Sequence, residues 1–137
     1  MLEEFEAIIN DDTSDDYWYD VALFSCQEMI NSFSDEEWKQ LSERINDYSE
    51  KVQTRCVECL SDSENKNSLS MILKLSDTQN RELFVTCVDS LRDMDTSSLL
   101  QSEKENLLQR VKEYSADASS FENAVFNALF NSIGYKE

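Results

Sequence analysis

Carboxylates and aromatic side chains gather near the N-terminus of this 137-residue chain, in the run Asp-Asp-Thr-Ser-Asp-Asp-Tyr-Trp-Tyr-Asp at positions 11–20. Tyrosine and tryptophan are common anchors of protein interfaces, and carboxylates steer a basic partner into register. Trp18 falls on the apolar stripe of an expected helix, so we expect it in the core. The other candidates are predicted to contact a partner: Asp11, Asp12, Asp15, Asp16, Tyr17, Tyr19 and Asp20.

A second acidic patch is predicted at the start of the following helix, at Asp35, Glu36 and Glu37. Every charged residue before Lys39 is acidic, so the first 38 residues carry −12 of the formal net charge of −17. Repulsion among these carboxylates costs stability, and binding of a cationic partner is one reason to tolerate that cost. The alternative is that acids at helix starts complement the helix dipole and that acidity serves solubility.

The composition excludes several kinds of active site and ligand. The chain has no histidine, which excludes Ser-His-Asp and Cys-His catalysis as well as histidine-ligated metals. With 29 acidic and 12 basic residues, it lacks the basic footprint of a nucleic-acid-binding protein. Its single glycine excludes a P-loop or a dinucleotide-binding motif.

The acidic run does not match a calcium loop or a catalytic carboxylate pair. An EF-hand loop beginning at Asp11 or Asp12 would lack the central glycine and would end on Ala22 or Leu23. A polar, exposed run also offers no means of raising one pKa for acid–base catalysis. We therefore predict no catalytic residue, no metal site and no cofactor, and we expect a protein that is not an enzyme.

The N-terminal residues lack the basic and apolar regions of a signal peptide, and no segment approaches the roughly 20 apolar residues of a membrane span. A cytoplasmic protein with reduced thiols is expected. Cys56 and Cys59 lack both the strand of a redox motif and the second ligand pair of a zinc site. We expect them to be buried like small hydrophobic side chains, together with Cys26 and Cys87. A membrane-surface helix is excluded because the polar face of the second helix is acidic.

The scarcity of glycine and proline and the apolar spacing predict an all-α fold in a single domain over 1–137. We expect about six to seven helices in antiparallel pairs. They are expected at 2–9, 16–33, 35–60, 68–75 and 78–92, then from 102 and from 119 to the helix-closing Gly134, with loops at 10–16 and 61–67. The segment 35–60 is expected as one long or kinked helix, with two helices joined by a bend near Asp47–Glu50 as the alternative.

Ser-x-x-Glu/Gln sequences predict capped helix starts at Ser34, Ser76, Ser102 and Ser119. The first two lie 42 residues apart (76 against 34), which is compatible with a short HEAT- or armadillo-like array of helix pairs. An irregular helical bundle is the alternative. In the last helix, the apolar residues are predicted to face the core from Phe121 onward.

A small, acidic, helical domain without histidine, with Trp38-x-x-Leu-x-x-x-Ile45 and successive helix pairs, resembles bacterial immunity proteins. These are the cognate antitoxins of polymorphic toxins, including contact-dependent growth inhibition systems. The resemblance covers the overall character of the chain and carries over no functional residue. It implies binding to the C-terminal domain of a toxin, often a nuclease or a transfer-RNA-cleaving enzyme, whose active site it blocks.

The expected function is therefore that of an inhibitor that covers a basic active-site cleft with acidic and tyrosine side chains. A monomer in a 1:1 complex with the toxin domain is expected, with no nucleic acid or membrane as partner. Two alternatives remain open. One is a phage or plasmid protein that mimics nucleic acid and inhibits a DNA-binding or defence protein, and the other is a helical adaptor or regulatory subunit.

Overall fold

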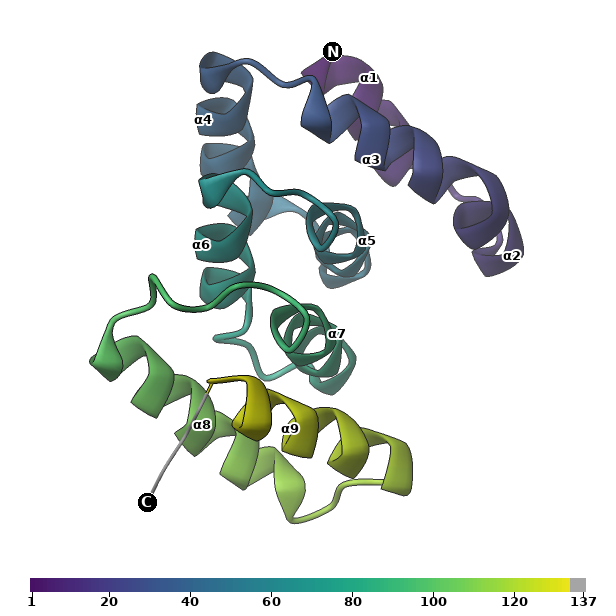
Figure 1. The fold of residues 1–137 in the computed structure, drawn as a ribbon. Coiled ribbons are helices and arrows are strands. Elements are labelled where there is room, and N and C mark those ends of the chain that lie inside the picture. Colours follow the sequence, from purple (N-terminus) through teal and green to yellow (C-terminus); the bar gives the residue numbers. More distant parts are fainter. Residues whose placement is uncertain (134–137) are drawn as a thin grey trace.

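The computed structural model describes residues 1–133, which form helices and connecting loops with no β-strand (Figure 1). The prediction of an all-α fold is confirmed. Gly134, predicted to close the last helix, lies outside the described residues. In chain order the α-helices are α1 (Leu2–Ile9), α2 (Asp15–Tyr17), α3 (Leu23–Asn31), α4 (Asp35–Arg44), α5 (Glu50–Leu60), α6 (Lys66–Leu75), α7 (Arg81–Leu91), α8 (Gln101–Ser115) and α9 (Ser120–Ile133).

The helices are arranged as a short array of pairs. Helices α3, α5, α7 and α9 follow one another so that each contacts the next, and we call them the inner helices. Helices α1, α6 and α8 pack on α3, α7 and α9 respectively, and α4 lies on the same outer side as α6 (Figure 1). One continuous apolar core joins the pairs into a single domain.

The two central pairs repeat with a period of 31 residues. Helix α6 begins 31 residues after α4 (66 against 35), and α7 begins 31 residues after α5 (81 against 50). The inner helices carry Cys-Val-Glu-Cys-Leu at 56–60 and Cys-Val-Asp-Ser-Leu at 87–91, with the matching Cys, Val and Leu side chains buried. The 42-residue spacing of Ser34 and Ser76 is not the period of the array, because Ser76 ends α6 instead of beginning a helix.

The core contains the side chains that the apolar stripes predicted, with one exception. Trp18 is 1% exposed and all four cysteines are buried, which confirms both predictions. Val125 and Leu129 of α9 are also buried. Phe121 is 65% exposed, so the prediction that it faces the core is wrong. It lies in the first turn of α9, at the edge of the surface groove described below.

The predicted helix at 16–33 is a continuous helix from Asp15 to Asn31 that contains a π-helical turn at Trp18–Ala22. The hydroxyl of Ser14 caps its start by accepting a hydrogen bond from the Tyr17 amide at 3.2 Å. A π-helical turn holds one more residue than an α-helical turn. The extra residue therefore keeps Trp18, Ala22 and Cys26, which are spaced four apart, on the buried side of the helix.

The prediction of one long or kinked helix over 35–60 is wrong, because the chain breaks between α4 and α5, and the alternative of two helices joined near Asp47–Glu50 is confirmed. Helix α4 ends in a 3₁₀ turn over Ile45–Asp47, and Tyr48 and Ser49 have extended backbones with ψ of 152° and 158°. The Ser49 hydroxyl then accepts a hydrogen bond from the Val52 amide at 3.3 Å. A side-chain cap therefore begins α5, with neither glycine nor proline at the break.

Two of the four predicted caps are confirmed. Ser34 and Ser119 each exchange hydrogen bonds with the glutamate three residues later. The caps predicted at Ser76 and Ser102 are wrong, because Asn80 caps α7 and α8 begins one residue before Ser102. Helix α6 also begins two residues earlier than predicted, which shortens the loop that follows α5.

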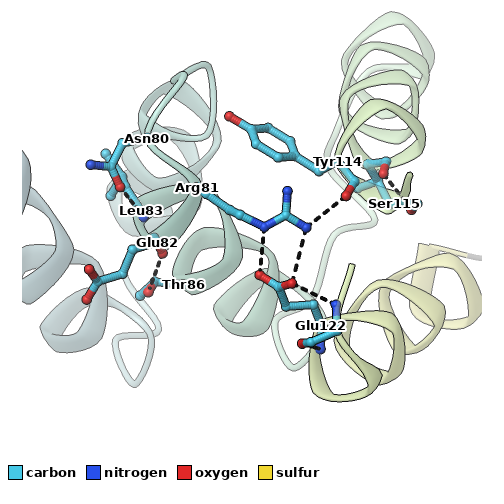
Figure 2. Close-up of polar contacts among 10 residues, drawn as sticks. Asn80, Arg81, Glu82, Leu83, Thr86, Tyr114, Ser115 and Glu122 are labelled. Atoms are coloured by element: carbon cyan, nitrogen blue, oxygen red, sulfur yellow. Dashed lines mark hydrogen bonds and ion pairs between the residues drawn. The ribbon is translucent and has the colours of Figure 1, made fainter. Parts of the chain in front are cut away.

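Arg81 of α7 ties the last helix pair to the array (Figure 2). Its Nε donates to Oε2 of Glu122 at 2.9 Å, and its Nη2 donates to Oε1 of Glu122 at 3.1 Å. The same Nη2 donates to the Tyr114 carbonyl at 2.9 Å, and the guanidinium lies 5.4 Å from the centre of the Tyr114 ring. One side chain thereby connects α7, α8 and α9.

Candidate protein-binding groove on the inner helices

Two adjoining hollows of about 370 and 340 Å³ meet at Tyr19 and Glu58, and we call their combined surface the inner groove. The groove crosses α5 and α7 and is bordered by the start of the α2–α3 helix and by the first turn of α9. Its lining residues are Asp15, Trp18, Tyr19, Leu23, Gln27, Glu50, Lys51, Thr54, Arg55, Glu58, Ser61, Asn80, Glu82, Val85, Thr86, Asp89, Ser90 and Phe121.

The helix-pair repeat explains why these side chains meet on one surface. Residues four apart lie on one face of a helix, and consecutive inner helices present equivalent faces. Three inner helices each contribute two lining residues that lie four apart: Leu23 and Gln27 on α3, Thr54 and Glu58 on α5, and Val85 and Asp89 on α7. The pairs on α5 and α7 are 31 residues apart in sequence, and α9 contributes Phe121.

Glu58 is the carboxylate at the centre of the inner groove. The indole Nε1 of Trp18 donates to its Oε1 at 3.3 Å. The Tyr19 hydroxyl is also hydrogen-bonded to this carboxylate, and that bond together with burial raises the pKa of Tyr19 to about 12. Burial raises the pKa of Glu58 itself, although Tyr19, Trp18 and Arg55 oppose this shift. Glu58 is thus a partly desolvated acid that two aromatic residues hold in a fixed place.

Acidic side chains outnumber basic ones in the inner groove. Asp15, Glu50, Glu58, Glu82 and Asp89 line it, against Lys51 and Arg55, and Asp89 is paired with Arg92 at 2.7 Å. Figure 2 shows Glu82 pointing away from its neighbour Arg81, so the ion pair at the last helix pair does not neutralise it. A surface with this excess of carboxylates suits a cationic partner.

Arg55 holds the acidic loop beside the groove in place. It is 4% exposed, and its Nη1 donates to the carbonyls of Ile9 at 3.3 Å and Asp11 at 2.8 Å. Its Nη2 donates to the Thr13 carbonyl at 3.1 Å, and the guanidinium lies 4.9 Å from the centre of the Trp18 ring. The loop between α1 and α2 is therefore fixed by backbone contacts, which leaves its carboxylates directed to solvent.

The three consecutive aromatic residues lie in three different environments. Trp18 enters the core, whereas Tyr19 lines the inner groove and is 57% exposed. Tyr17 is 50% exposed and lines a separate hollow of about 210 Å³ with Ile8 and Val21. The candidate contact residues that the sequence grouped together are thus divided between two surfaces.

The structure divides the predicted acids of residues 11–20 in the same way. Asp15 lines the inner groove, and Asp11 lines the hollow that contains Tyr17. Asp12, Asp16 and Asp20 are exposed and line neither.

The acids predicted as a second patch lie away from the inner groove. The Glu37 carboxylate accepts hydrogen bonds from the amides of Ser34 at 3.0 Å and Leu2 at 2.9 Å, and the bond from Ser34 lowers the pKa of Glu37. Asp35 lines a different hollow that also contains two lysines. Glu36 is exposed and accepts a hydrogen bond from the side chain of Gln40 at 3.5 Å. Glu37 bonds to Leu2 at the start of α1, whereas the acids of residues 11–20 follow the end of α1. The two acidic regions therefore lie at opposite ends of this helix.

Sequence reasoning missed the acids that α5 and α7 bring to the groove. Only the fold places Glu50 and Glu82 beside Tyr19, since they belong to different helix pairs. Glu58 did carry a signal, because it is an acid inside the apolar run 56–60. The equivalent position in the next repeat is also an acid, Asp89.

The arrangement of the groove suits binding of cations from a partner. Within residues 1–133, no three Asp, Glu or Cys side chains converge in a way that could hold a metal ion. No helix among the same residues is both long and apolar enough to cross a membrane. A fixed, partly desolvated carboxylate flanked by an aromatic ring is well suited to a lysine or arginine side chain.

Comparisons of this chain with protein-family models, with curated proteins and with solved structures give no match.

Proposed function

We propose that this protein is a non-catalytic inhibitor of the immunity-protein type, which binds a basic toxin domain through the inner groove and the acidic loop beside it. The observation that carries the proposal is Glu58, a partly buried carboxylate that Trp18 and Tyr19 orient in a groove where acids predominate.

The electrostatics of Glu58 support a cationic occupant. Burial disfavours the charged form of this carboxylate, and an arginine or lysine of a partner would stabilise that form by pairing with it. Tyr19 stays protonated at neutral pH, so its hydroxyl can keep donating to Glu58 while its ring contacts the incoming side chain. The groove is therefore preorganised to receive a basic side chain.

The acids around the groove support rapid capture of the partner. Lys39 is the first basic residue of the chain, so no positive side chain in the first 38 residues weakens the field beside the groove. Such a field accelerates the association of a basic surface and is screened by salt. A nuclease domain is the proposed partner because enzymes that bind nucleic acid carry a basic cleft, which the acidic surface would cover in a 1:1 complex.

Capture from the native source, followed by kinetics on the purified pair, tests this proposal. The test variant combines Glu58→Gln with Asp15→Asn. The matched control combines Glu64→Gln with Asp47→Asn, which removes the same charge at exposed positions outside the groove. We expect a basic partner whose nuclease activity falls in proportion to added protein, up to a 1:1 ratio. The groove variant should bind at least about tenfold more weakly, and the control variant within about threefold of wild type.

Three results would contradict the proposal. Equal weakening by the two variants would mean that net charge alone governs binding, with no role for the groove. An association rate that is the same at low and high ionic strength would remove the electrostatic argument. A captured partner without enzymatic activity, such as a structural DNA-binding protein or the rest of a multisubunit complex, would favour the mimic or adaptor alternative.

A further inference from the structure

Helix α3 has an inner-helix neighbour on one side only. Within the described residues, α5 contacts both α3 and α7, and α7 contacts both α5 and α9, whereas α3 contacts α5 alone among the inner helices. Figure 1 shows α3 at the end of the array, with α1 as its partner in the first pair. Within residues 1–133, the side of α3 that faces away from α5 therefore has no inner helix packed against it, and α1 borders this side at the hollow beside Tyr17 and Val21.

This outward side carries large apolar residues, and we call it the end face. It consists of Tyr17, Val21 and Phe24, which are 50%, 48% and 64% exposed. Val21 and Phe24 are neighbours three residues apart on the helix, and the π-helical turn places Tyr17 beside Val21 rather than in line with Phe24. Tyr17 and Val21 also line the hollow that Ile8 of α1 borders. The terminal units of helical arrays normally present a polar outer face, which keeps the protein soluble. A contiguous apolar patch at such an end indicates an interaction surface.

The residues around the end face determine the charge of its partner. Asp20 and Glu28 lie four residues before and after Phe24, so they flank it on the same side of the helix, and both are exposed. Asp11 lies at the edge of the hollow beside Tyr17. A second copy of this chain would bring identical carboxylates together across a two-fold contact. The partner must therefore carry positive charges around an apolar centre.

The shape of the end face indicates the secondary structure of that partner. Helix α3 already packs against α5 and buries Cys26 and Ile30, whereas Val21 and Phe24 on the end face have the three-residue spacing that one helix offers to another. We propose that the end face binds a basic amphipathic α-helix of another protein, which adds one more helix to the inner row. Its apolar stripe would cover Tyr17, Val21 and Phe24, and its flanking lysines or arginines would reach Asp20 and Glu28.

Fluorescence anisotropy with a designed peptide tests this proposal on the full chain. The probe is a labelled helical peptide of about five turns, with leucine on one face and lysine on the other. One comparison peptide replaces lysine with glutamate, and a second keeps the lysines but has serine in place of leucine. At physiological ionic strength, we expect the leucine–lysine peptide to bind at least about tenfold more tightly than either comparison peptide.

Two phenylalanines with the same exposure provide a matched pair of variants. Phe24→Ser should weaken binding of the leucine–lysine peptide at least about tenfold. Phe121→Ser should leave it unchanged, since Phe121 is 65% exposed at the edge of the inner groove and is not part of the end face. Both positions are on the surface, so circular dichroism should show the same helical content for both variants. Equal loss in the two variants, or no loss with Phe24→Ser, would overturn the proposal.

Two further measurements separate this surface from the inner groove and from self-association. Glu58→Gln should not change peptide affinity, and a large loss with this variant would place the peptide in the groove and overturn the proposal. Light scattering should show a monomer at all concentrations. A dimer that Phe24→Ser dissolves would make a second copy the occupant and would also overturn it. The proposal does not depend on the function proposed for the groove.

Discussion

Arg55 and Arg81 secure the two ends of the array by different means. Both stack on an aromatic ring, that of Trp18 for Arg55 and that of Tyr114 for Arg81. Arg81 also forms two hydrogen bonds with Glu122, which lower the pKa of that carboxyl to about 2 (Figure 2). The hydrogen bonds of Arg55 go to three backbone carbonyls instead. One arginine thus uses its charge to neutralise an acid, and the other uses its hydrogen-bond donors to shape a loop.

The difference separates acids that are paired within the fold from acids that keep their charge at the surface. At the C-terminal end, Glu122 also accepts a hydrogen bond from the Ser119 amide, so it belongs to the helix start as well as to the ion pair. At the N-terminal end, burial raises the pKa of Glu58, and its hydrogen bonds come from aromatic side chains. Neutral donors hold Glu58 in place without cancelling its charge. Glu58 thereby differs from Glu6 of the same two helix pairs, which forms an ion pair with Arg44.

Removing Arg55 should have the largest effect on stability. Arg55→Met would remove the donor that Arg55 provides to the Ile9 and Thr13 carbonyls and would leave the Asp11 carbonyl with the Thr13 amide alone. It is expected to lower the free energy of unfolding by about 3 kcal/mol. Urea unfolding measures this loss, and hydrogen exchange should show that residues 2–31 open more readily than the last two helix pairs. Arg44→Met is the control, because Arg44 is 46% exposed and its ion pair with Glu6 should contribute at most about 1 kcal/mol. Equal losses would mean that Arg55 has no special role.

Removing the carboxylate of Glu122 should change the pH dependence of stability. The pKa of Glu122 is about 2 in the folded state against an ordinary value of 4.5, so the unfolded state binds more protons between these values. Its contribution is complete above pH 4.5 and is lost as the pH falls towards 2. Glu122→Gln should therefore be less stable than wild type at pH 7, with the difference disappearing near pH 2. Urea midpoints across this range measure the effect, and a pH-independent difference would contradict it.

Removing the carboxylate of Glu58 should change the pH dependence of stability in the opposite direction. Its pKa is raised in the folded state, so the folded protein binds more protons just above pH 4.5, and the ionised group lowers stability as the pH rises further. Glu58→Gln should match or exceed wild type in its urea midpoint at pH 7, while partner binding weakens. A variant that is clearly less stable at pH 7 would show that the carboxylate serves the fold, as Glu122 does.

The two exposed phenylalanines should have the smallest effects on stability. Phe24→Ser and Phe121→Ser should each change the free energy of unfolding by no more than about 0.5 kcal/mol, because neither side chain is in the core. Thermal unfolding of the two variants measures this. A loss well above that limit for Phe24 alone would mean that the end face is part of the folded core rather than a surface.

Local signals in the sequence predicted much of the fold. The bounds of α1, the burial of Trp18 and the caps at Ser34 and Ser119 each depend on residues within one or two helical turns, and each is confirmed. The break at Tyr48–Ser49 was missed because the apolar spacing continues across it and a serine side chain, rather than glycine or proline, makes the cap.

The inner groove could not be predicted in the same way, because its lining comes from helices that are distant in sequence. The run of acidic and aromatic residues identified Asp15 and Tyr19 as candidate contact residues. The position of Glu58 opposite them depends on how α3 packs on α5. The matching runs at 56–60 and 87–91 were the available clue. They give the 31-residue period, and that period aligns Glu58 with Asp89 on neighbouring helices.

The π-helical turn at Trp18–Ala22 has a consequence for how this part of the chain tolerates a change in length. Because the turn already accommodates one additional residue, deletion of a single codon there would leave an ordinary α-helix. The residues before and after the turn would keep close to their present orientations, since the wide turn compensates for the residue that it contains. Asp15 and Tyr17 would then stay in place relative to α3, and only side chains within the turn, Tyr19 among them, would be redirected. The turn is thus a point at which one mutational event could change the edge of the inner groove without rebuilding the scaffold.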